Sequence, residues 1–111
     1  MNYQEKTDKG LIDLYLSGDI KALGVLISKY KDKLYTSIYL WIKDKNLSED
    51  ILQNVFIKII EEINWGKYTD QNRFYPWMAR IAHNMCVDHF RSKKAKASRD
   101  KIHDPYYFFE K

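Results

Sequence analysis

The 111-residue sequence has few of the residues that cross-link a chain or interrupt regular structure, with one cysteine, two prolines and four glycines. A single cysteine, Cys86, excludes an internal disulfide and fits a reducing, cytoplasmic environment. No apolar run approaches the ~20 residues of a membrane-spanning helix, and the first ten residues lack the apolar core of a secretory signal. With so few turn residues, we expect long helices.

The sequence also lacks the groupings that carry catalysis. It has no glycine-rich phosphate loop and no evident pairing of a nucleophile with a base. His83, Cys86 and His89 lie three residues apart, which on a helix spreads them over about 120° of the surface instead of converging on one metal. We therefore expect no enzyme activity, no metal site and no cofactor.

Charge is divided between two parts of the chain. Residues 73–99 carry seven lysines and arginines against one acid, Asp88, a net charge of +6. Residues 44–63 carry five acids against two lysines, a net charge of −3. Because the whole chain has a net charge of only +4, this split predicts one surface for an anion and another for a different partner.

Apolar residues recur every three to four positions over most of the chain, which predicts an all-α fold, a compact bundle of about four helices. The expected helices cover residues 11–16, 19–42, 48–63 and 76–93, with Asn46 or Ser48 capping the third. Residues 1–9 are expected to fray. We expect one domain over 1–96, followed by an interdomain linker or tail over 97–111 that includes an aromatic cluster, Tyr106–Phe109.

The third predicted helix has an outward side that we call the isoleucine face. It is polar except for Ile57 at its centre, and its members are Asp50, Gln53, Asn54, Ile57 and Glu61. Single apolar residues are common on protein surfaces. The alternative is a protein-docking surface, with one apolar anchor inside a polar rim.

The fourth predicted helix, starting at Pro76, has an outward side that we call the arginine face. At about 100° per residue its members fall in one row: Arg73, Trp77, Arg80, Asn84, Asp88 and Arg91. Arginine suits phosphate, a carboxamide can contact a base edge, and an aromatic ring can stack on a base. Lys94 extends the row, and the preceding loop adds Trp65 and Tyr68.

Two structural interpretations compete with nucleic-acid binding here. The rings of the 64–75 loop are also suited to closing one end of the core, which we expect for Phe74 and at least one other ring. Trp77 fits core packing and base contact equally well. The arginine face taken alone is also typical of a solvated charged stripe, in which case the chain is a helical protein–protein interaction module that binds no nucleic acid.

Three segments together resemble one family. They are Ser48–Phe56 (SEDILQNVF), the loop from Trp65 to Tyr75, and Trp77–Asn84 (WMARIAHN) continuing to Asp88 and Arg91. In this order and spacing the chain resembles region 2 of bacterial RNA polymerase sigma factors of the extracytoplasmic-function group, over about residues 8–95.

The resemblance implies a role in promoter recognition and transcription initiation. The isoleucine face would dock on the clamp helices of the largest subunit of core RNA polymerase. The Trp65–Tyr75 loop would capture a base flipped from the non-template strand of the minus-ten promoter element, Asn84 would contact that strand, and the arginines would hold phosphates. The resemblance also allows an anti-sigma factor as a partner, without identifying one.

Two departures limit what the resemblance carries over. The loop sequence varies within the family, so neither the base-pocket residues nor the base is assigned. The helix-turn-helix domain that reads the minus-thirty-five element has no counterpart in these 111 residues. We therefore expect a single-domain piece of a longer protein.

Overall fold

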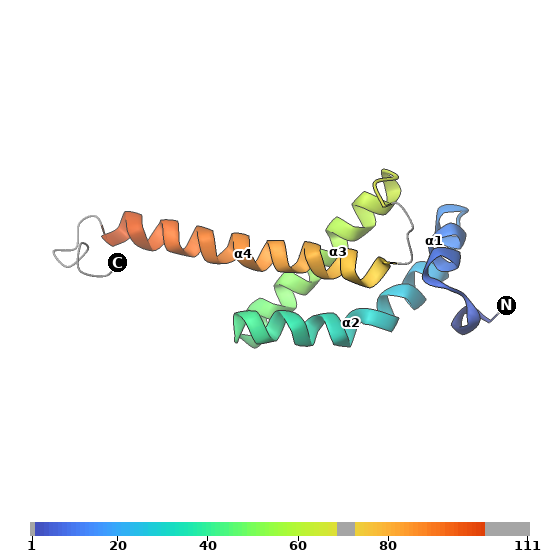
Figure 1. Cartoon of the computed structure of the whole chain (residues 1–111), viewed down its shortest axis with the longest axis horizontal. Coiled ribbons are helices and arrows are strands. Elements are labelled where there is room, and N and C mark those ends of the chain that lie inside the picture. The colour runs from blue at the N-terminus through green and yellow to red at the C-terminus, as the bar shows by residue number, and fades with distance from the viewer. Residues whose placement is uncertain (1, 69–72, 102–111) are drawn as a thin grey trace.

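The computed structural model describes residues 2–68 and 73–101, with side chains described as far as residue 93. These residues form helices and no strands, so the predicted all-α bundle is confirmed (Figure 1). The elements are a short 3₁₀ turn, η1 (Tyr3–Glu5), and four α-helices, α1 (Asp8–Leu16), α2 (Ile20–Ile42), α3 (Lys45–Asn64) and α4 (Phe74–Lys101). None of the described helices is both long and apolar enough to cross a membrane.

The junction of α1 and α2 depends on a glycine and on a capping carboxylate. Gly18 has a φ of +114°, a conformation that residues with a Cβ rarely adopt. Asp19 then caps α2, its carboxylate accepting a hydrogen bond from the backbone N–H of Lys21 at 3.1 Å. The tight turn lets α1 pack back against the first half of α2.

The expectation that residues 1–9 fray is wrong for the residues described there. Asn2 caps η1 by accepting from the backbone N–H of Gln4, and the Tyr3 hydroxyl donates to the Asp19 carboxylate at 2.7 Å. α1 already begins at Asp8, with Thr7 as its cap. Polar side chains therefore hold this segment in place without an apolar run.

The third and fourth helices both begin earlier than predicted. Asp44 caps α3 by accepting from the backbone N–H of Leu47 at 3.0 Å, which leaves Ser48 fully buried in the first turns. Asn46 and Ser48 are thus not the caps. α4 begins at Phe74, so Pro76 is its third residue, where the missing N–H has no partner within the helix in any case.

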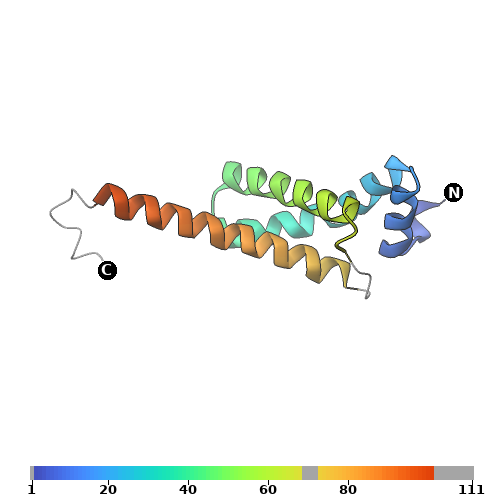
Figure 2. The ribbon, with the colours of Figure 1, turned by 90° about the horizontal axis from the view of Figure 1, so that it is seen from above.

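The core lies where the four α-helices meet. Each contributes an apolar stripe of buried residues: Leu11 and Ile12 from α1; Ala22, Leu26, Leu34 and Ile38 from α2; Ile51, Val55, Ile59 and Ile63 from α3; and Phe74, Met78, Ala82 and Cys86 from α4. Among the side chains described, which reach residue 93, the last buried one of α4 is Cys86, and the helix itself continues to Lys101, beyond its predicted end at residue 93. Figures 1 and 2 show this second part of α4 extending past the ends of α2 and α3.

Candidate functional site

The arginine face lies on the exposed side of α4. Arg80, Asn84 and Arg91 are all exposed, and their spacing of four and seven residues keeps them within about 40° around the helix axis. The opposite side of the same turns holds Met78, Ala82 and Cys86 in the core. Burial of that apolar stripe therefore fixes the direction in which the arginine and asparagine side chains point.

These basic groups are available for an external anion. Within the described part of the chain, the ion pairs join Lys9 to Asp13, Lys29 to Asp8 and Lys58 to Glu62, so none uses an arginine of α4. Arg73 is exposed immediately before α4 begins. The side chain of Lys94 lies outside the described residues.

A cluster of aromatic rings packs at the start of α4, and we call it the ring cluster. Phe74 is buried, and its ring centroid lies 5.7 Å from that of Trp77 and 5.4 Å from that of Tyr68. On the other side, Tyr30 of α2 contacts Phe74 at 5.9 Å and Tyr75 at 5.3 Å. The expectation that Phe74 and at least one further ring close this end of the core is confirmed.

Trp77 and Tyr68 are both half-buried, so the structure gives each a packing role. Their ring centroids lie 4.8 Å apart at an interplanar angle of 53°. Tyr68 therefore covers part of the Trp77 ring. Of the two interpretations that the sequence left open for Trp77, core packing accounts for the part of the ring that Tyr68 and Phe74 contact, and the rest of the ring stays exposed.

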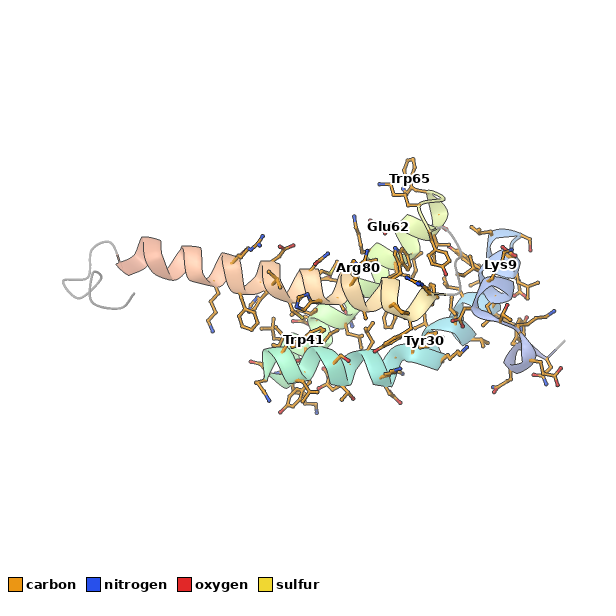
Figure 3. The ribbon with its side chains drawn as sticks, viewed as in Figure 1. Lys9, Tyr30, Trp41, Glu62, Trp65 and Arg80 are labelled. Atoms are coloured by element: carbon orange, nitrogen blue, oxygen red, sulfur yellow. The ribbon has the colours of Figure 1, made fainter. Side chains whose placement is uncertain are left out.

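Trp65 lies apart from the ring cluster. It is the C-cap residue of α3 and is 79% exposed. Figure 3 shows its side chain at the end of α3, projecting away from the bundle, whereas Arg80 lies along α4. The sequence grouped Trp65 with Tyr68 because both fall in one loop; in the structure Tyr68 packs against Phe74 and Trp77, whereas Trp65 is exposed at the end of α3.

The isoleucine face is exposed along the outward side of α3. Asp50, Gln53, Asn54 and Glu61 are all exposed around Ile57, which is 55% exposed. The inward side of α3 is apolar and buried. The prediction of a polar surface with a single apolar residue at its centre therefore matches the position of these residues in the structure.

The described residues contain no grouping of His, Cys, Asp and Glu that could hold a metal ion. Cys86 is buried against the core, and burial raises the pKa of its thiol above the usual value, which keeps it protonated. His83 instead contacts Trp41 of α2, with ring centroids 5.0 Å apart in an edge-to-face arrangement. His89 lies against Phe90, with ring centroids 5.7 Å apart, so the three residues have separate packing environments.

Comparison with known proteins identifies the family. The sequence pattern of sigma-70 region 2 matches residues 26–96. The chain belongs to the sigma-70 region 2 family. Members of this family are transcription initiation factors and not enzymes. The matched region includes the isoleucine face, the ring cluster and the arginine face.

Individual relatives place this sigma-70 region 2 chain with the extracytoplasmic-function group. It is 33% identical over 85 residues to the ECF RNA polymerase sigma factor BldN of Streptomyces coelicolor, covering 76% of this chain and 31% of that protein. It is 34% identical over 77 residues to the ECF RNA polymerase sigma factor SigW of Bacillus subtilis, covering 69% and 40%.

The RNA polymerase sigma-H factor of Pseudomonas aeruginosa is 27% identical over 106 residues, covering 94% of this chain and 54% of that protein. The chain thus spans about a third to a half of the length of these relatives. No solved structure matches it significantly.

Proposed function

We propose that this sigma region 2 chain docks on core RNA polymerase through the isoleucine face and recognises and melts the minus-ten promoter element through the arginine face. The observation that carries the proposal is the separation of the two surfaces. Arg80, Asn84 and Arg91 share one exposed side of α4, while Ile57 is at the centre of a polar, acidic side of α3. The work is expected to take place in the cytoplasm, where an anti-sigma factor would compete for one of these surfaces.

The arginine face would provide both affinity and base selectivity for a single DNA strand. Arg73, Arg80 and Arg91 would hold phosphates, a contribution that is independent of sequence and weakens as salt rises. Asn84 presents a donor and an acceptor on one carboxamide, which suits the edge of a single base. Because the two arginines of α4 flank Asn84, phosphates held at both would bring the intervening bases close to the carboxamide.

Melting requires that a base be more favourably placed in the protein than in the duplex. Removing a base from the stack costs a few kcal/mol, and stacking on an aromatic side chain returns roughly 1–3 kcal/mol per base. The exposed part of Trp77, two helical turns before Asn84 on the same side of α4, is the ring best placed for this contact. With only a few phosphate contacts, binding by this domain alone should be weak, so polymerase must hold it on the promoter.

The isoleucine face has the composition of a protein-docking surface. Ile57 provides an apolar anchor, and the amides of Gln53 and Asn54 with the carboxylates of Asp50 and Glu61 provide a polar rim. The acidic rim disfavours DNA and favours a partner with basic groups. These properties suit the clamp helices of the largest polymerase subunit.

The proposal is tested by titrating the chain with single-stranded oligonucleotides at several salt concentrations. The wild-type chain first selects a cognate strand from a randomised pool. We expect tighter binding to this strand than to a scrambled strand of equal composition, with affinity for both falling as salt rises. Equal binding to the two strands, or no selection at all, would instead support the protein–protein interaction module.

A further inference from the structure

Trp65 extends the isoleucine face along the axis of α3. Gln53, Ile57, Glu61 and Trp65 lie four residues apart, and all four are exposed. Residues at this spacing form a continuous ridge on a helix surface, and such ridges pack into the grooves of a facing helix. The ridge is about 18 Å long, with one polar residue between its two apolar members.

Trp65 does not pack with the rings that we propose to lie near a DNA base. The rings of Tyr68, Phe74 and Trp77 lie within 4.8–5.7 Å of one another. Within the described residues, no ring contact includes Trp65. An indole that is 79% exposed at a helix end is also among the largest apolar groups available for a partner to cover.

The charges around Trp65 do not favour a phosphate. The indole borders a shallow depression whose other lining residues are two lysines and two glutamates, namely Lys58, Glu61, Glu62 and Lys67. One lysine is already paired, with Lys58 Nζ 3.6 Å from Glu62 Oε1. This balance contrasts with the arginine face, whose arginines have no acidic partner among the described ion pairs.

We infer that Trp65 is the second anchor of the polymerase-docking surface, at the end of the ridge formed by Gln53, Ile57 and Glu61, and does not stack on a promoter base. The inference rests on the proposed docking of the isoleucine face on polymerase. It adds a specific requirement, which is that the partner has a helical surface with two apolar pockets about 12 Å apart, matching eight residues of α3. Between these pockets, a basic group would face Glu61.

The test measures two affinities for each variant, one for purified core RNA polymerase and one for the selected single strand. Trp65→Ala removes the indole, Trp65→Phe keeps a ring, and Ile57→Asp tests the proposed first anchor. Because both residues are exposed, these changes should leave the fold intact, which circular dichroism checks. Leu16→Asp is the matched control, since Leu16 in α1 is 54% exposed, like Ile57.

We expect Trp65→Ala to weaken polymerase binding about 10- to 30-fold, as for an aromatic hot spot, and to leave the affinity for the single strand within about twofold. Trp65→Phe should recover part of the loss, and Leu16→Asp should change neither affinity. Loss of strand binding with unchanged polymerase binding would overturn the inference in favour of base stacking. Two unchanged affinities for Trp65→Ala would also overturn it.

The Ile57→Asp variant distinguishes failure of this inference from failure of the proposed function. If Ile57→Asp weakens polymerase binding and Trp65→Ala does not, the docking surface ends before Trp65 and the proposed function stands. If neither variant weakens it, the isoleucine face is not the docking surface, and both the inference and that part of the proposed function are wrong.

Discussion

The outward sides of α3 and α4 differ in charge although the two helices are built on the same principle. Each helix buries an apolar stripe, with Val55, Ile59 and Ile63 on α3 corresponding to Met78 and Ala82 on α4. The exposed side of α3 then presents acids, amides and an isoleucine, whereas that of α4 presents arginines, an asparagine and one acid, Asp88. The core specifies the fold, and under the proposed function the exposed residues determine which class of partner each helix contacts.

This comparison predicts that the two sides can be disabled separately. The affected residues are exposed, so their substitution should alter binding with little change in the free energy of unfolding. Substitution of residues that hold one helix against another should lower the free energy of unfolding with little change in binding.

Reversing charge on the arginine face should cause the largest loss of single-strand binding. We expect the double variant Arg80→Glu and Arg91→Glu to weaken binding to all single strands roughly 10- to 100-fold at low salt, because two phosphate contacts become repulsive. The plot of log affinity against log salt should become less steep by about 1.4, or roughly 0.7 for each lost contact. Polymerase binding should not change.

The matched control reverses two lysines that are exposed on α2, Lys21→Glu and Lys31→Glu. It changes the net charge by the same amount at a different place. Equal loss of strand binding in the control and in the arginine variant would show that only total charge matters, and would contradict a defined arginine face.

Introducing a charge at the centre of the isoleucine face should abolish docking. Ile57→Asp would place a carboxylate in the apolar pocket that we expect on polymerase, which costs about 2 kcal/mol or more for a hot-spot residue. Co-purification with core polymerase and titration of the purified components measure the effect. Normal co-purification of a folded Ile57→Asp variant would refute this docking surface.

Removing the carboxamide of Asn84 should reduce selectivity more than affinity. We expect Asn84→Ala to weaken binding to the selected strand about tenfold, within the range for a base-edge contact, while the scrambled strand is bound nearly as before. Competition between the two strands measures this ratio directly. A loss of the same size on both strands would leave Asn84 without a role in specificity.

The contacts that hold α1 on α2 should affect stability and not binding. Asp8 accepts hydrogen bonds from Lys29 Nζ at 2.7 Å and from the Tyr30 hydroxyl. We expect Asp8→Ala to lower the free energy of unfolding by about 1 kcal/mol, as for a partly exposed cluster. Asp13→Ala, which removes an exposed pair with Lys9, should have a smaller effect, and neither should alter either affinity.

The same cluster gives a pH dependence whose sign follows from the pKa shifts. The hydrogen bond to Asp8 raises the pKa of Lys29, and burial followed by the Asp8 hydrogen bond raises the pKa of Tyr30. Both groups hold their protons more tightly in the folded chain than in the unfolded chain. Their contribution to the free energy of unfolding is therefore complete below the unfolded pKa values, 10.0 for Tyr30 and 10.5 for Lys29, and is lost as pH rises above them. Thermal unfolding should therefore show a smaller alkaline loss for Asp8→Ala than for the wild-type chain.

The sequence predicted the fold and the inward side of each helix because burial follows a period of 3.6 residues. Leu26, Leu34 and Ile38 of α2 lie where that period places them. Helix starts were less predictable because they depend on which polar side chain reaches a free N–H. Asp44 makes that contact at α3, although Asn46 and Ser48 have equally suitable side chains.

The candidate site was predictable only in part, for a similar reason. Periodicity placed Arg80, Asn84 and Arg91 on one side of a helix, and the structure has them exposed there. The end of α3 was predicted to within one residue, but periodicity does not specify in which direction Trp65 points once the helix has ended. The partial cover of Trp77 by Tyr68 is a contact between residues nine apart that do not share a helix, and no periodic pattern encodes it.

The most direct test of whether the isoleucine face and the arginine face bind different partners is to titrate the selected single strand into the chain already bound to core RNA polymerase. The Arg80→Glu and Arg91→Glu variant, bound to polymerase in parallel, measures the strand binding that is due to polymerase itself. If α3 and α4 serve different partners, the bound chain should take up the strand at least as tightly as the free chain. Displacement of the chain from polymerase by the strand would mean that both partners compete for one surface, and would contradict the account.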